Sequence, residues 1–142
     1  MINRLLSTEL MDLVQRSLDA SALSHRVIAN NIANVDTPGF KSSEVVFTEK
    51  LKQALQARKN AGDALPLERT DARHFSLQAG PDLDAIKPEV VTDVTGQLRN
   101  DGNNVDIDHE VAMLAQNTIW YQTLAQITKS QFTELTAAIK GT

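Results

Sequence analysis

The sequence predicts a mainly α-helical fold, in which long N- and C-terminal helices pack as a coiled-coil-like hairpin and a middle segment carries a short helix and irregular or small β structure. Two observations predict this fold. Apolar side chains recur at alternating spacings of three and four near both ends of the 142-residue chain, which is the period of helices that pack side by side. The middle keeps no such period and holds most of the glycine and proline. The chain therefore divides at 1–41, 42–104 and 105–142.

The first helix is predicted over residues 8–34. Its main row of apolar and small side chains is Met11, Val14, Leu18, Ser21, His25, Ile28 and Ile32. A flanking row, Leu10, Leu13, Ala20 and Val27, widens the stripe beyond what one partner helix would cover. We expect His25 to be a polar insert that fixes helix register rather than a metal ligand.

The end of this helix is predicted near Asn34, because the residue before Pro38 is excluded from helical geometry. Thr37-Pro38-Gly39-Phe40 predicts a type II turn, in which proline presets the first central angle and glycine accepts a positive φ at the second. The amides of Asn30, Asn31 and Asn34 leave two alternatives open. They cap the helix end locally, or they bond neighbouring backbones across a helix–helix contact.

The C-terminal helix is predicted from residue 105 onward. Its row is Ile107, Val111, Leu114, Thr118, Tyr121, Ala125, Thr128, Phe132, Leu135 and Ile139. Asp106 is placed to cap its N-terminus, and Lys140 suits the last turn. In the middle segment, a short helix is predicted over 46–59 and one short strand over 89–95, with much of 60–104 as loop, extended or mobile chain.

Composition excludes several kinds of protein. The net charge of −4, with both signs interspersed, argues against a nucleic-acid or anionic-membrane partner. The absence of cysteine excludes disulfides, zinc thiolate sites and cysteine nucleophiles. No apolar run approaches the roughly 20 residues that span a bilayer, and the N-terminus lacks the pattern of a cleaved secretory signal.

No constellation predicts an enzyme or a cofactor site. The acidic cluster at 101–108 fails the calcium-loop spacing, and a Gly-Asn turn running into a capped helix accounts for it. Asp106, Asp108 and His109 suggest a metal-dependent hydrolase only weakly, because neighbouring side chains on a helix diverge. His74 lies in a predicted loop and has no assignable role. The sequence predicts no catalytic residue, metal or small-molecule substrate.

The predicted helical seam is thin, since serine, histidine and threonine occupy several of its positions. Burial of so little apolar surface barely offsets the entropy of ordering two long helices. We therefore expect an isolated chain to be marginally stable and to gain order by packing against further helices. Copies repeated around an axis through open contacts would form a tube or filament.

Residues 30–41 resemble the N-terminal signature of the bacterial flagellar rod and hook axial proteins, Asn-Ile/Leu-Ala-Asn-x-x-Thr-Pro-Gly-Phe/Tyr. The C-terminal part, with Asp101–Asp108, Leu114–Asn117 and Tyr121-Gln122, is similar to the proximal-rod member of that family. The two blocks and their helices cover about half of the chain. Gln116 and Trp120 depart from the residues usual in the family.

This resemblance implies a structural subunit of the proximal rod, which assembles helically into the drive shaft that transmits torque and surrounds the export channel. It implies export without a cleaved signal peptide and a place in the basal body, in the rod that crosses the periplasm. The implied partners are copies of the chain, other rod proteins, the rod–membrane-ring adaptor and the export gate. The alternative from the residues alone is a small coiled-coil adaptor that binds one partner helix.

Two sets of residues are expected to matter most. The structural turn is Thr37, Pro38 and Gly39. The assembly interface is Met11, Val14, Leu18, His25, Ile28, Asn30, Asn31, Ile32, Asn34, Val111, Leu114, Tyr121, Phe132, Leu135 and Ile139.

Overall fold

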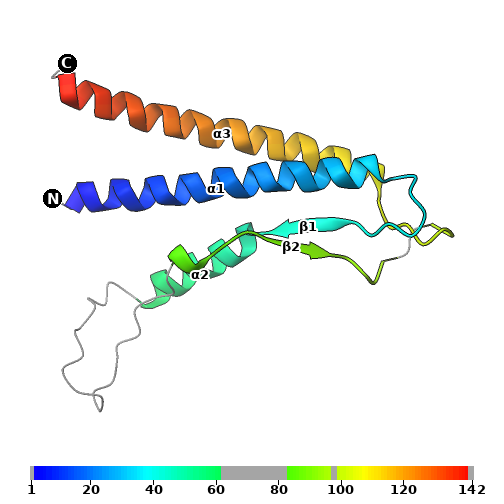
Figure 1. Ribbon diagram of the computed structural model, residues 1–142. Coiled ribbons are helices and arrows are strands. Elements are labelled where there is room, and N and C mark those ends of the chain that lie inside the picture. The colour runs from blue at the N-terminus through cyan, green and yellow to red at the C-terminus, as the bar shows by residue number, and fades with distance from the viewer. Residues whose placement is uncertain (1, 62–82, 97–98, 141–142) are drawn as a thin grey trace, which may run out of the picture. The chain divides into compact units, whose positions relative to one another are not determined.

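The structure is a computed structural model that describes residues 2–61, 83–96 and 99–140. In chain order its elements are α1 Ile2–Ala33, β1 Ser43–Val46, α2 Thr48–Ala61, a 3-10 helix Leu83–Ala85, β2 Glu89–Thr92 and α3 Ile107–Lys140 (Figure 1). The chain forms two compact units, one of Met1–Val45 with Glu89–Thr142 and one of Val46–Pro88. None of the helices in the described ranges is long and apolar enough to cross a membrane.

The larger unit is built on a hairpin of α1 and α3. The two helices run side by side in opposite directions (Figure 1), and at the usual helical rise their 32 and 34 residues span about 50 Å each. The predicted mainly helical hairpin is confirmed. The first helix begins at Ile2 rather than near residue 8. It ends at Ala33, close to the predicted end near Asn34 that Pro38 imposes.

The predicted type II turn is also confirmed. The Phe40 amide donates to the Thr37 carbonyl at 3.2 Å, and Gly39 adopts φ +72° at the second central position. At the other junction, the Asp106 carboxylate accepts hydrogen bonds from the amides of Asp108 and His109, as expected of an N-cap.

A two-stranded sheet of β1 and β2 accompanies the hairpin, and its arrows point in opposite directions (Figure 1). The Asp93 amide donates to the Ser42 carbonyl at 2.9 Å at one end of this sheet. The predicted strand 89–95 is shorter, because the Asp93 carboxylate accepts bonds from the amides of Thr95 and Gly96 and turns the chain. The strand β1 was not predicted from the sequence.

In its described residues, the smaller unit contains α2 and the 3-10 helix, which lie in contact. The helix predicted over 46–59 is present but occupies Thr48–Ala61, since Val46 ends β1. Phe47 and Ala54 are buried, and the Phe47 carbonyl accepts the Leu51 amide at the start of α2. Much of the loop predicted within 60–104, including His74, lies outside the described residues.

The positive φ of Gly39 yields a test of the turn. Valine at this position should lower the free energy of unfolding by about 1–3 kcal/mol, because β-branched residues rarely adopt this backbone conformation. Steric overlap is not the cause, since a Cβ at Gly39 would meet nothing within 4 Å. Gly39→Asn should cost less, because asparagine tolerates the left-handed region. Urea unfolding of the three proteins makes the comparison, and equal stability of wild type and Gly39→Val would contradict it.

Candidate assembly interface

Two pairs of polar side chains join α1 to α3. Ser21 donates from Oγ to the Asn117 Oδ1 atom at 2.7 Å, and the Asn117 Nδ2 atom donates to the Ser21 carbonyl at 3.0 Å. One and a half heptads further along α1, the Asn31 Nδ2 atom donates to the Glu110 Oε1 atom at 2.9 Å. These pairs tie positions 96 and 79 residues apart in the sequence, so they set the register of the hairpin.

Asn31 resolves the two alternatives for the helix-end amides. Its side chain is completely buried, donates to the Ser43 carbonyl at 2.8 Å and accepts from the Ser43 amide at 3.1 Å. It thus acts across elements, joining α1 to β1 and α3. Asn34, in contrast, donates to the Asn30 carbonyl at 2.8 Å and acts locally. Both expected roles occur, in different asparagines.

The face that α1 buries is narrow and partly polar. From residue 10 onward, its buried residues are Val14, Ser17, Ala20, Ser21, Ile28 and Asn31. Small side chains at these positions let two helix backbones approach closely but bury little apolar area. His25 is exposed, so it sets no register within the hairpin, and its role at a contact between chains stays a prediction. Asn31 and Asn117 set the register of the hairpin, because they bond Glu110 and Ser21 across it.

Glu110 places a carboxyl group inside this seam, where only 7% of the residue is exposed. Desolvation by burial raises the pKa of the Glu110 carboxyl, and the hydrogen bond from Asn31 lowers it in part. His109 also lowers the pKa, whereas the charges of Glu44 and Asp106 raise it. The site therefore favours the neutral acid more than water does.

The side chain of Asn103 bonds the backbone that follows α1, a role that was not predicted from the sequence. Its side chain is fully buried, and the Nδ2 atom lies 2.9–3.1 Å from the carbonyl oxygens of Asn34, Val35 and Thr37. Its Oδ1 atom accepts the Val105 amide at 2.7 Å. The Asn103-Asn104 pair before a capped helix was the available signal, but it was interpreted only as a turn.

The loop at 99–104 and the turn at 37–39 meet backbone to backbone. The Gly39 amide donates to the Asp101 carbonyl at 3.0 Å, and a Cβ at Gly102 would lie 3.7 Å from the Gly39 Cα atom. Gly102 itself has φ +83°. Arg99 adds a hydrogen bond of 2.9 Å to the Val35 carbonyl. We call these contacts, with those of Asn103, the turn–loop lock.

Large apolar side chains remain uncovered along α3. They form a stripe of Ile107 (47% exposed), Val111 (52%), Tyr121 (45%), Phe132 (57%), Leu135 (51%) and Ile139 (85%), which we call the α3 stripe. Contiguous exposed apolar surface of this kind marks a place where another molecule packs.

The predicted interface residues fall into three groups. Val14, Ile28 and Asn31 are buried within the chain, and Met11, Leu18, Ile32, Asn34 and Leu114 are half-buried. His25, Asn30 and the members of the α3 stripe are exposed, as are Thr37, Pro38 and Gly39 of the turn. Some of the predicted interface residues are therefore buried between α1 and α3, and the others are exposed on the surface of the chain.

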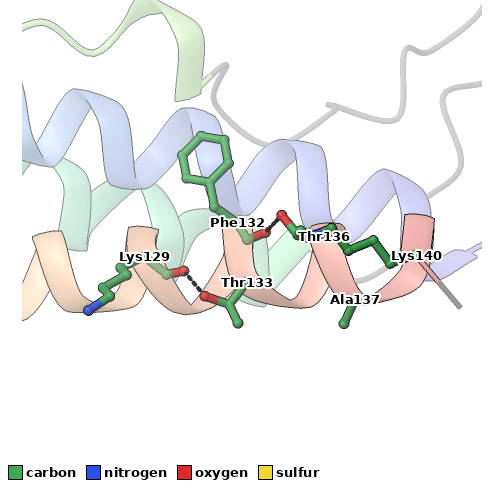
Figure 2. A pocket seen from close by; sticks show the side chains of 6 residues that line it. All are labelled: Lys129, Phe132, Thr133, Thr136, Ala137 and Lys140. Carbon is green, nitrogen blue, oxygen red and sulfur yellow. Dashed lines mark hydrogen bonds between the residues drawn. The ribbon is translucent and has the colours of Figure 1, made fainter. Parts of the chain in front are cut away.

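The described part of α3 shows no cluster of side chains that would suit a ligand or a metal ion. A shallow hollow near the end of α3 is lined by side chains of that helix alone, from Lys129 to Lys140 (Figure 2). The hydroxyls of Thr133 and Thr136 donate to carbonyls one turn earlier, so they do not point to a ligand. Within the described ranges, no three His, Cys, Asp or Glu side chains come together as a metal site.

The sequence is similar to known flagellar proteins. A family model described as flagella basal body rod protein matches residues 20–41. The flagellar basal body rod protein FlgB of Borrelia hermsii is 38% identical over 130 residues, which cover 92% of this chain and 95% of the relative. FlgB of Bacillus subtilis is 34% identical over 128 residues, covering 90% and 91%. FlgB of Escherichia coli is 34% identical over 108 residues, covering 76% of each.

The buried Glu110 yields a prediction about pH. A carboxyl with a raised pKa in the folded chain contributes stability below its unfolded pKa and loses it as pH rises through the folded value. In Glu110→Gln the amide oxygen still accepts the bond from Asn31, but no charge is buried. We expect this variant to melt above wild type at pH 7, with the difference shrinking toward about pH 4. Circular dichroism melts at several pH values measure the difference.

Glu134→Gln is the matched control, because Glu134 is exposed on the same helix. Because its side chain is already exposed, this substitution should change the melting temperature little. A difference between Glu110→Gln and wild type that stays constant from neutral to acid pH would contradict the interpretation.

The turn–loop lock yields a second prediction. Asn103→Ala removes the donor to three carbonyls and should lower the free energy of unfolding by about 1–3 kcal/mol. Asn103→Asp should be at least as damaging, because it retains the acceptor for Val105 but sets a carboxylate against carbonyl oxygens. Asn100→Ala, in an exposed position of the same loop, is the control. Chemical unfolding measures the free energy of unfolding of each variant. If Asn103→Asp were as stable as wild type, the Asn103 side chain would not act as a stabilising donor.

Proposed function

The chain belongs to the FlgB family of flagellar basal body rod proteins, and from this we propose that it is a subunit of the proximal rod that assembles helically with copies of itself and with other rod proteins. Family membership confirms the resemblance drawn from the two sequence blocks. It makes the chain a structural component of the flagellar basal body rather than an enzyme.

The observation that carries the proposal is the α3 stripe. Six large apolar side chains, each about half exposed or more, lie along one helix of 34 residues. Residues 111–128 of the same helix contain no charged side chain, so a partner helix would bury no unpaired charge there. A surface of this composition supports permanent packing against other helices.

The stripe also continues onto α1. A helix turns about 100° per residue, so Val111, Tyr121 and Phe132 lie on one flank of the α3 row that faces α1. By the same rotation Met11, Leu18 and Ile32 lie on one flank of the α1 row that faces α3. Because the helices are antiparallel, these two flanks belong to the same side of the hairpin. A neighbouring helix laid along that side would cover both sets.

Such contacts would serve the mechanical role proposed for the rod, which is to transmit torque. A helix pair with a fixed register resists sliding, and repeated lateral packing spreads load over many subunits. We further propose that the assembled rod surrounds the export channel and meets the membrane-ring adaptor and the export gate. The chain would reach the rod without a cleaved signal peptide and cross the periplasm as part of it.

A charge in the stripe tests this proposal. Leu135→Asp should leave the chain folded, because Leu135 is 51% exposed in the monomer, but it should abolish incorporation into the rod by burying a carboxylate between subunits. Gln126→Asp is the control, because Gln126 is exposed on the opposite side of the same helix. Swimming and purified basal bodies are the readouts. Normal swimming of the Leu135→Asp strain would refute the role assigned to the stripe.

A further inference from the structure

A second apolar row runs along the other flank of α3. Trp120 is the only tryptophan of the chain, and it is 51% exposed. Ile127, seven residues later, is 38% exposed, and Met113, seven residues earlier, is half-buried. Residues seven apart occupy nearly the same side of a helix. We call Met113, Trp120 and Ile127 the tryptophan row.

The tryptophan row and the α3 stripe lie on opposite sides of the contact with α1. Asn117 marks the direction of α1, since it bonds Ser21. Rotation of about 100° per residue places Trp120 roughly 60° to one side of Asn117 and Tyr121 roughly 40° to the other. The helix α3 therefore presents three apolar sides in succession, of which only the central one is covered by α1.

Two different apolar surfaces on one subunit favour a head-to-tail contact between copies over a symmetric one. A symmetric dimer pairs one patch with the same patch of its partner, and it leaves any second patch uncovered. A head-to-tail contact pairs two different patches and can repeat without closing after two copies. Trp120 would be the anchor of such a contact, because tryptophan contributes strongly to binding when it is half exposed beforehand and then enclosed.

We propose, on the basis of the rod role above, that the tryptophan row of one copy packs against the α3 stripe of the next copy. The contact is heterologous, and each subunit uses both flanks of α3 at once. Trp120 and Ile127 thus form an interface with a second copy of this chain, separate from the stripe that receives them.

Three features favour a second copy as the occupant. The whole tryptophan row lies in the uncharged stretch 111–128, together with Val111 and Tyr121 of the α3 stripe, so a contact between these residues buries no unpaired charge. The tryptophan row and the α3 stripe both border the contact between α1 and α3. Apolar surface therefore continues from that contact around both sides of α3. An aromatic side chain buries roughly 150–250 Å², so Trp120 on one copy and Tyr121 with Phe132 on the next would each supply part of the roughly 800 Å² that a standard interface buries per partner.

Paired cysteines test the contact, because the chain contains none of its own. Cells would express two copies together, one with Ile127→Cys and the other with Tyr121→Cys or Phe132→Cys. Basal bodies are then isolated and oxidised. We expect a disulfide between the two unlike copies for at least one pair, and no dimer when either variant is expressed alone. Cysteines bridge only when their Cα atoms approach within about 7 Å.

Two results would overturn the proposal while leaving the rod role intact. Dimers of each variant with itself would indicate a symmetric contact. Normal rods and swimming with no disulfide in any pair would show that the tryptophan row meets something other than this chain. Failure of the rod role itself is distinguished by absence of the wild-type chain from basal bodies.

A second measurement needs no cysteine. Trp120 is the sole tryptophan, so its fluorescence should shift to shorter wavelength as the wild-type chain self-associates at rising concentration. Trp120→Ser should lose self-association measured by sedimentation, whereas Ile119→Ser should retain it, since Ile119 is 65% exposed but points away from both rows. Unchanged emission on association, or equal loss in both variants, would contradict the assignment.

Discussion

The buried amide of Asn31 joins three parts of the chain that are far apart in the sequence. It bonds Glu110 of α3 and both backbone groups of Ser43 at the start of β1, with no exposure to water. Leaving any of these partners unsatisfied in the interior would cost about 1–3 kcal/mol. The requirement to satisfy them fixes the register of α1 against α3, and the rest of the larger unit follows from that register.

This polar seam determines what the surface looks like. Serines at 17 and 21 bring the helices together without filling the space with large side chains, and the amides of Asn31 and Asn117 take positions that apolar residues would otherwise hold. Polar inserts of this kind specify one pairing at some cost in stability. The large apolar residues of α3 remain outside this seam, where a neighbouring molecule could cover them.

Local signals in the sequence predicted the features that depend on a few adjacent residues. The turn at Thr37–Phe40, the end of α1 and the Asp106 cap follow from the geometry of proline, glycine and a capping carboxylate. The strand β1 was not predicted, because its partner lies far away in the sequence, with Ser43 meeting Thr92 across 49 positions. The apolar stripes were found, but periodicity does not distinguish a side that packs within the chain from one that packs between chains. Asn103 was missed because the same residue type serves equally in a simple turn.

The hairpin is closed at one end and open at the other. Near the turn–loop lock, Asn103, Asn31 and Glu110 are buried and hydrogen-bonded across elements. Along α3 the last buried residue is Leu124, and beyond it Phe132, Leu135 and Ile139 are all more than half exposed. Few contacts within the chain therefore order this end of the helix. A subunit built in this way is held in register near Asn31 and Glu110. Toward the C-terminal end of α3, it leaves apolar side chains exposed where neighbouring subunits would lie. Packing between subunits would then complete the fold and the assembly in a single step.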